Sequence, residues 1–114
     1  MIYEMNLNPG PFKVMKSGLK TIEMRLDDER RKDIKIGDVI IFTEVVTKEQ
    51  LKVEVLDLYR YPSFEELYKH FDKGELGYQK DEEASHNDML EYYPKDKIEK
   101  YGVLGIRIKL LQAQ

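Results

Sequence analysis

Residues 51–58 have the sequence Leu-Lys-Val-Glu-Val-Leu-Asp-Leu, in which apolar residues first alternate and then shift by one position. The first three apolar residues share one parity, whereas Leu56 and Leu58 have the other. Successive side chains of a strand point to opposite faces, so this shift needs an extra residue such as a β-bulge or a barrel corner. Because bulges bend and twist their strands, the stretch predicts a strongly curved sheet.

Four further segments are expected to supply strands, at residues 1–7, 20–26, 39–42 and 104–110. In 20–26, Ile22, Met24 and Leu26 alternate with polar residues, which predicts a half-buried strand with one polar face. The segment 39–42 is apolar throughout, which indicates a central strand that is not half exposed.

Helices are expected between these strands. Pro11 suits the first position of a helix over about 11–17, and Gly18 suits its end. Ser63 and Glu66 match a capping box that begins an amphipathic helix extending to Phe71. A second helix is expected over about 81–92, with the acidic run Asp81-Glu82-Glu83 in its first turn, and Pro94 is expected to open another turn through Lys100. Five strands with inserted helices and no βαβ rhythm predict an α+β fold with a curved, mainly antiparallel sheet or small barrel.

Length and composition narrow the class of protein. The 114 residues suit one domain spanning 1–114, and no apolar run is long enough to cross a membrane. The N-terminus lacks the pattern of a secretory signal. Absence of cysteine excludes disulfides, thiolate zinc sites and cysteine nucleophiles, and it fits a cytoplasmic protein. No cofactor is expected.

Charge is distributed unevenly along the chain, whose net charge is −3. Residues 61–94 contain three basic and nine acidic side chains, a net charge of −6, so the remainder carries +3. Residues 12–35 contain eight basic and five acidic side chains. The balance excludes a broadly basic nucleic-acid binder, but it allows a local basic site.

The densest group of chemically capable residues is Gly18-Leu19-Lys20-Thr21-Ile22-Glu23-Met24-Arg25. A lysine just after a helix, followed by an acid and an arginine on one face of a strand, brings two cations and an anion close together. Such a group can orient a polar ligand. On spacing alone, it can equally be a partly exposed Glu23–Arg25 ion pair that contributes little stability and implies no function.

The spacing Gly18-x-Lys20-x-x-Glu23-x-Arg25 resembles the G-x-K-x-x-E-x-R signature of the ASCH domain family, which is related to PUA domains. The resemblance extends over nearly the whole chain through six short pieces in the same order, namely Pro11-Phe12, Arg30-Arg31, Gly37-Asp38, Phe64-Glu65-Glu66, Tyr92-Tyr93-Pro94 and Tyr101-Gly102-Val103. It implies a PUA-like β-barrel of five to six strands with surrounding helices, and a cleft where the signature residues meet.

For this family, the cleft is generally proposed to bind RNA. The resemblance therefore implies a single-stranded RNA segment, a nucleotide or a nucleoside as ligand, held by Lys20, Glu23 and Arg25. Cations that could contact phosphates are Lys13, Lys16, Lys20, Arg25, Arg30 and Arg31, and the tyrosines that could stack on a base are Tyr61, Tyr92 and Tyr93. The acidic helical region favours a small footprint.

A second branch of the family, similar in length, hydrolyses N4-acylated cytidines. Resemblance to this branch implies catalytic machinery made of a lysine at the position of Lys20, a threonine nucleophile at the position of Glu23 and a glutamate from the later helical region. This chain departs at the nucleophile, and Thr21 does not align with it. Lys20 could still act as base if burial favoured its neutral form, with an acid at Glu75, Glu82 or Glu83 to orient it.

Two weaker alternatives stay open. His70 and His86, with Asp72 and Asp88 two residues beyond each, match no familiar metal-ligand spacing, so no metal site is predicted. A module that binds a protein partner without catalysis is the third functional class. We lean toward ligand binding over an enzyme.

Overall fold

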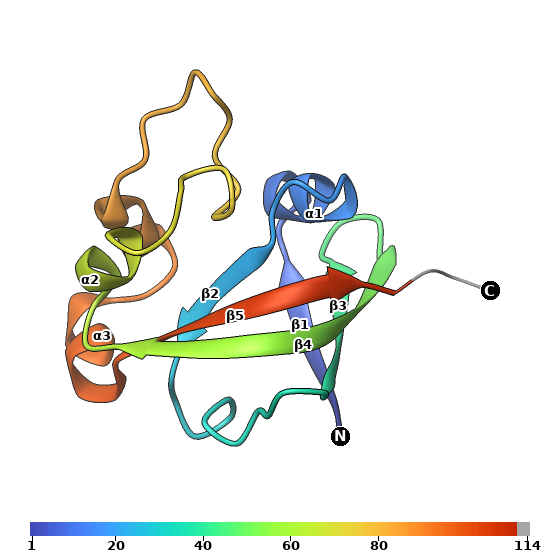
Figure 1. Cartoon of the computed structure of the whole chain (residues 1–114), viewed down its shortest axis with the longest axis horizontal. Coiled ribbons are helices and arrows are strands. Elements are labelled where there is room, and N and C mark those ends of the chain that lie inside the picture. Colours follow the sequence, from blue (N-terminus) through green and yellow to red (C-terminus); the bar gives the residue numbers. More distant parts are fainter. Residues whose placement is uncertain (112–114) are drawn as a thin grey trace.

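The computed structural model describes residues 1–111, so the last three residues of the expected 1–114 domain lie outside it. Its five strands are β1 (Ile2–Leu7), β2 (Ile22–Leu26), β3 (Val39–Glu44), β4 (Gln50–Tyr61) and β5 (Val103–Leu110). They form one curled sheet with the order β1-β3-β4-β5-β2 (Figure 1). β1 and β3 are parallel and the other neighbouring pairs are antiparallel. The predicted α+β fold with a curved, mainly antiparallel sheet is confirmed as a five-stranded half-barrel.

The curvature has the local cause that the sequence predicts. The pairing of β4 with β5 shifts between Val55 and Asp57, which leaves Leu56 as the extra residue of the bulge. Val55 and Leu58 both pack in the apolar core, whereas Leu56 is exposed. The bulge therefore keeps the apolar face of a long strand turned inward while the strand bends.

The helical elements are α1 (Pro9–Lys16), α2 (Phe64–Tyr68), the 3₁₀ helix η1 (His86–Glu91) and α3 (Lys95–Tyr101). α1 begins two residues earlier than expected and is closed by Gly18, whose φ of +87° suits glycine. The Ser63 hydroxyl accepts a hydrogen bond from the Glu66 N–H at the start of α2. The turn expected after Pro94 is α3.

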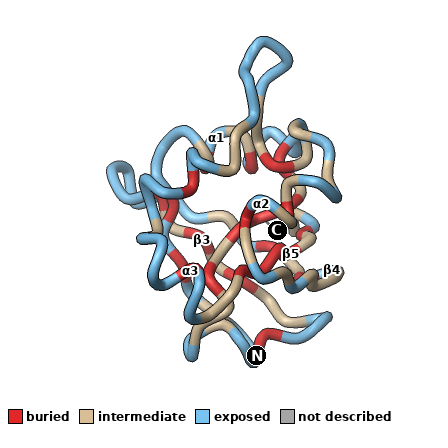
Figure 2. Tube along the Cα trace, turned by 90° about the vertical axis from the view of Figure 1, so that its left-hand side faces the viewer, coloured by how far each residue is buried: buried red, intermediate tan, exposed pale blue. Residues whose placement is uncertain are grey.

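The predicted helix over 81–92 is wrong. Residues 78–85 form an irregular loop that reaches away from the sheet, and helical structure begins only at His86 after the Ser85 cap (Figures 1 and 2). The Lys73 ammonium donates to the carbonyl groups of Lys80 and Glu82, which occupies acceptors that a helix would use. Thus the acidic run at 81–83 lies in an exposed loop, not in a first helical turn.

Two further expectations about extent and exposure are corrected. α2 ends at Tyr68, and Phe71 leaves the helix to pack edge-on against the ring of Tyr59, at 5.0 Å between centroids. β3 is an interior strand as expected, but Val39 and Ile41 are half-buried because they lie on the outer face of the half-barrel.

β2 lies between two apolar clusters. The first fills the half-barrel and includes Phe42, and the second lies between the sheet and the helices and includes Ile22, Met24 and Leu26. β2 was expected to be half buried, yet Glu23 is buried as well. The reason is that its polar face points into the half-barrel, where the Arg25 guanidinium lies 5.9 Å from the ring centre of Phe42.

The two edges of the sheet approach each other at one place. β1 and β2 are the edge strands, and the Arg25 guanidinium donates to the Asn6 carbonyl across the gap, at 2.7 Å. Arg25 therefore bridges the open seam of the half-barrel. Within residues 1–111, no helix has the length and apolar character needed to span a membrane.

Candidate functional site

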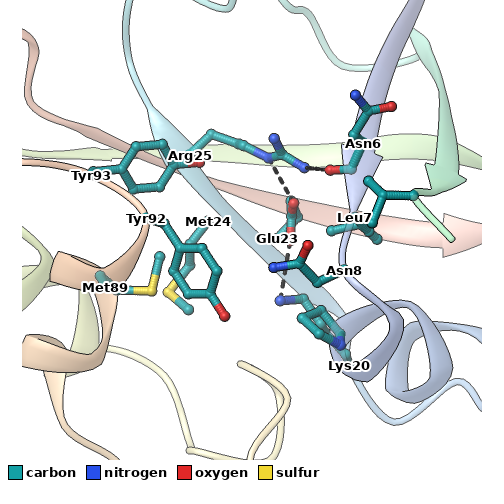
Figure 3. A pocket seen from close by; sticks show the side chains of 12 residues that line it. Asn6, Leu7, Asn8, Lys20, Glu23, Met24, Arg25, Met89, Tyr92 and Tyr93 are labelled. Carbon is teal, nitrogen blue, oxygen red and sulfur yellow. Dashed lines mark hydrogen bonds and ion pairs between the residues drawn. The ribbon is translucent and has the colours of Figure 1, made fainter.

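Three charged side chains of the signature stretch form a buried cluster. Lys20 Nζ lies 3.1 Å from Glu23 Oε1, and Arg25 Nε lies 2.7 Å from Glu23 Oε2 (Figure 3). The side chains of Lys20, Glu23 and Arg25 are only 8%, 4% and 11% exposed. One carboxylate thus holds two cations, and the cluster carries a net charge of +1. This arrangement excludes the exposed surface pair that spacing alone allowed.

The electrostatics of the cluster keep Glu23 and Arg25 ionised. Burial by itself raises the pKa of Glu23, but the cations of Lys20 and Arg25 outweigh it, so the pKa lies below its ordinary value of 4.5. Burial likewise lowers the pKa of Arg25, and the neighbouring Glu23 carboxylate more than compensates and raises it. At neutral pH, Glu23 is therefore an anion and Arg25 a cation.

Lys20 is held by the loop 72–78. The Glu75 carbonyl accepts hydrogen bonds from the N–H groups of Thr21 and Ile22, both at 3.0 Å. Gly77 has a φ of +106°, and a Cβ at this position would lie 3.2 Å from Lys20 Cδ. The loop therefore packs directly against the aliphatic part of Lys20 and excludes water from it.

Arg107 on β5 fixes this loop from the other side. Its guanidinium lies 3.3 Å from the Glu75 carboxylate and donates to the Tyr59 hydroxyl at 3.0 Å. It also lies over the rings of Tyr59 and Phe71. Arg107 thus anchors the loop that packs against Lys20.

The cluster forms one side of a pocket of about 280 Å³ at the open seam of the half-barrel. Figure 3 shows β1 on one side of this pocket and the segment carrying Met89, Tyr92 and Tyr93 on the other. Tyr92 is 48% exposed at the rim. The lining residues are Asn6, Leu7, Asn8, Pro11, Lys20, Glu23, Met24, Arg25, Val45, Met89, Tyr92 and Tyr93. We call this space the seam pocket.

Main-chain groups of β2 also face the seam. The Thr21 carbonyl bonds to β5 through the Ile108 N–H, whereas the Ile22 N–H points away from β5 to Glu75. Because alternate residues of a strand bond to opposite sides, Met24 presents its N–H and C=O to the open edge. The seam pocket therefore combines cationic donors, a main-chain donor and acceptor, and apolar walls.

The structure brings together some of the sequence candidates and separates others. Lys20, Glu23, Arg25, Tyr92 and Tyr93 line the seam pocket. The candidates that are not among its lining residues are Lys13, Lys16, Thr21, Arg30, Arg31, Tyr61, Glu75, Glu82 and Glu83.

Several of these separated residues have other contacts. Lys16 pairs with Glu49, Arg31 with Asp28 at 2.8 Å, and Tyr61 stacks on His70 at 4.9 Å between ring centroids. His70 and His86 are not joined in a ligand set, and residues 1–111 contain no group of three histidine or acidic side chains that could hold a metal.

Sequence reasoning missed most of the pocket walls. Asn6 and Asn8 flank Leu7 where β1 ends and α1 begins, and two amide side chains at this junction were an available signal. Met89 and Val45 carry no such signal, because they reach the pocket from a 3₁₀ helix and a hairpin turn whose positions depend on tertiary packing.

Comparison with known proteins agrees with this architecture. The hypothetical protein PH0355 has a crystal structure similar to this chain, with 32% identity, a TM-score of 0.81 and coverage of 97% of this chain and all of that one. Protein PF0455 from Pyrococcus furiosus, solved by NMR, has 34% identity and a TM-score of 0.70, and the match covers 99% of this chain and 100% of that protein.

A more distant structure shares the fold. The ASCH protein from Zymomonas mobilis has 14% identity and a TM-score of 0.64, with 93% of this chain matched to 65% of that one. No curated protein matches the sequence. The model of the ASCH domain family matches residues 5–112, which is nearly the whole sequence, and the chain therefore belongs to the ASCH domain family.

Proposed function

We propose that this protein binds a nucleotide-like ligand, either free or as an unpaired nucleotide of single-stranded RNA, in the seam pocket. The observation that carries the proposal is the buried cluster of net charge +1 at one side of a small pocket with apolar walls. Ligand sites typically combine apolar walls with a few placed polar groups. A planar base with carbonyl groups matches this combination.

The chemistry of the cluster assigns a role to each side chain. Lys20 and Arg25 donate hydrogen bonds to a base carbonyl or a phosphate oxygen. Both oxygens of Glu23 are engaged by these cations, so its role is to hold them in place. The exposed ring of Tyr92 offers a face for stacking, which stabilises unpaired bases.

The size and charge of the molecule favour a small ligand. A volume of about 280 Å³ lies just below the usual range of ligand pockets and suits a single base. The net charge of −3 opposes a long electrostatic contact with a polynucleotide. An oligonucleotide should therefore contact the protein through few phosphates. Its binding constant should fall by about 0.7 log units for each phosphate contacted when the salt concentration rises tenfold.

The test compares two lysines by fluorescence anisotropy with a labelled, mixed-sequence single-stranded RNA of ten nucleotides. Lys20→Met keeps an aliphatic side chain against Gly77 but removes the charge, and it should weaken binding about tenfold. Lys13→Met removes the same charge from the exposed surface of α1 and should change affinity less than twofold. Equal losses in both variants, or no binding of either this RNA or free nucleosides by the unaltered protein, would contradict the proposal and favour a protein partner.

The geometry supports hydrolysis of N4-acylated cytidine less well. The residues that line the seam pocket include no serine, threonine or cysteine, and Glu23 at the nucleophile position is bound by two cations. The Glu75 carboxylate contacts Arg107, so it does not orient Lys20. Incubation with N4-acetylcytidine and chromatographic detection of cytidine tests this alternative directly.

A further inference from the structure

A second pocket of about 250 Å³ adjoins the seam pocket. The two spaces share the walls formed by Pro11, Lys20, Met24, Met89 and Tyr92. The second pocket is completed by Tyr68, Leu76, Gly77, Tyr78, Asp88 and Glu91. Each space alone is smaller than a usual ligand site, whereas the two together have the size of one. They are therefore two ends of one groove.

The two ends differ in hydrogen-bonding character. Lys20 borders both pockets and Arg25 lines only the seam pocket, whereas the carboxylates of Asp88 and Glu91 line only the second pocket and add acceptors there. Asp88 Oδ2 accepts from the Tyr78 hydroxyl at 2.8 Å, and that hydroxyl lies 2.8 Å from the hydroxyl of Tyr68. Asp88 and Glu91 are exposed, and within residues 1–111 neither the Glu91 carboxylate nor Asp88 Oδ1 forms a hydrogen bond or an ion pair.

A ligand that fits both ends must present acceptors to the first and donors to the second. A nucleoside whose base carbonyl faces Lys20 places its sugar in the second pocket, and ribose hydroxyl groups are donors that carboxylates commonly bind. A phosphate suits the second pocket less well than a sugar, because the carboxylates of Asp88 and Glu91 outnumber Lys20, the cation that borders this pocket.

We propose that the second pocket is a ribose subsite in which Glu91 and Asp88 accept hydrogen bonds from the sugar hydroxyl groups of the ligand. The inference rests on the proposed function, because it assumes that the base occupies the seam pocket. Two hydroxyl groups are free only in a nucleoside, a 5′-nucleotide or the 3′-terminal nucleotide of RNA. The natural ligand therefore carries a free 2′,3′-diol, and a 3′-phosphate weakens its binding.

The experiment titrates ¹⁵N-labelled protein with uridine, cytidine, adenosine and guanosine, followed by amide chemical shifts. The best ribonucleoside is then compared with its 2′-deoxy form and its 3′-phosphate. We expect shifts in both pockets, at Asn6, which lines only the seam pocket, and at Tyr78, which lines only the second. The ribonucleoside affinity should be about tenfold higher than that of either analogue, as a hydrogen bond to a charged group implies.

Variants assign the preference to the second pocket. Glu91→Gln is nearly isosteric and should reduce the preference for ribose over deoxyribose to about twofold or less, while the affinity for the deoxyribonucleoside stays the same. Asp88→Asn keeps an acceptor for Tyr78 and should act in the same direction. Glu83→Gln removes the same charge from the exposed loop, outside both pockets, and should leave the preference unchanged.

The outcomes separate the two proposals. Ribose and deoxyribose forms that bind equally, with shifts confined to the seam pocket, would overturn the ribose subsite and support the proposed function. The ribose subsite would also be overturned if Glu91→Gln and Glu83→Gln changed the preference for ribose over deoxyribose equally. If neither nucleosides nor the oligonucleotide shift any residue of the seam pocket, the proposed function fails, and the ribose subsite fails with it.

Discussion

The buried cluster on β2 and the surface pair Lys16–Glu49 use the same residue types in very different surroundings. The Lys16 and Glu49 side chains are 55% and 46% exposed, so water screens their attraction and such a pair contributes at most about 1 kcal/mol. In contrast, Glu23 and its two cations have lost nearly all contact with water. Desolvation costs several kcal/mol per ion, and pairing offsets this cost only with good geometry.

The difference shows what marks a site in this protein. Both ion pairs belong to a chain in which more than a third of the residues are charged, so residue type alone does not distinguish them. What distinguishes the cluster from the surface pair is that its unbalanced charges are buried. Apolar residues of the same volume at these positions would leave the fold no less stable. Folding stability therefore does not account for the cluster, and this supports the proposal that it serves a ligand.

The largest expected effect comes from removing the shared carboxylate. Glu23→Gln leaves two buried cations without their anion, and it should lower the free energy of unfolding by about 3–5 kcal/mol. Glu49→Gln makes the same chemical change at the surface and should lower it by less than about 1 kcal/mol. Urea unfolding followed by circular dichroism measures both.

This pair of variants can break the comparison. Losses of similar size at the two positions would show that the cluster is hydrated in solution and that its burial does not distinguish it from the surface pair. A folded spectrum for Glu23→Gln before urea is added is the control for the measurement.

A smaller effect is expected in the loop that keeps Lys20 buried. Gly77→Ala places a methyl group about 3.2 Å from Lys20 Cδ at a φ of +106°, and the backbone strain should cost about 1–2 kcal/mol. Gly74→Ala in the same loop has a negative φ and an open position, so it is the matched control. We expect Gly77→Ala to weaken RNA binding as well, and Gly74→Ala to leave it unchanged. Equal affinities would mean that the loop does not position Lys20.

Local rules predicted the elements whose cause lies in a few neighbouring residues. The phase change around Leu56 predicted the bulge, Gly18 predicted the end of a helix, and Ser63 predicted the cap of another. Each depends on backbone geometry or on a single hydrogen bond, so sequence is sufficient. Glu23 and Arg25 were also found, because they alternate with apolar residues along one short strand, and Lys20 was found because it lies just before that strand.

Features that depend on the curled sheet were not predictable in this way. The burial of Glu23 depends on β1, β3 and the loop carrying Gly77, which are distant in sequence. The loop at 78–85 has the composition of a helix start, but a lysine ammonium takes its carbonyl groups. The walls formed by Met89 and Val45 follow from the same long-range packing.

The smallest effect, and the one that sharpens the comparison most, is the decrease in stability at acidic pH. Because the pKa of Glu23 lies below 4.5 in the folded protein, this carboxylate stabilises the fold fully at neutral pH. As the pH falls below the pKa of an unfolded glutamate, the unfolded chain takes up a proton first, and stability falls by about 1.4 kcal/mol per pH unit. The loss ends once the pH has passed the lowered pKa.

Glu23→Gln lacks this contribution, whereas other carboxylates with lowered pKa values, such as Glu44 and Asp38, remain in both proteins. Thermal melts from about pH 6 to pH 3 should therefore show a shallower decline for Glu23→Gln, and parallel curves would mean that the carboxylate is not paired with its cations in solution.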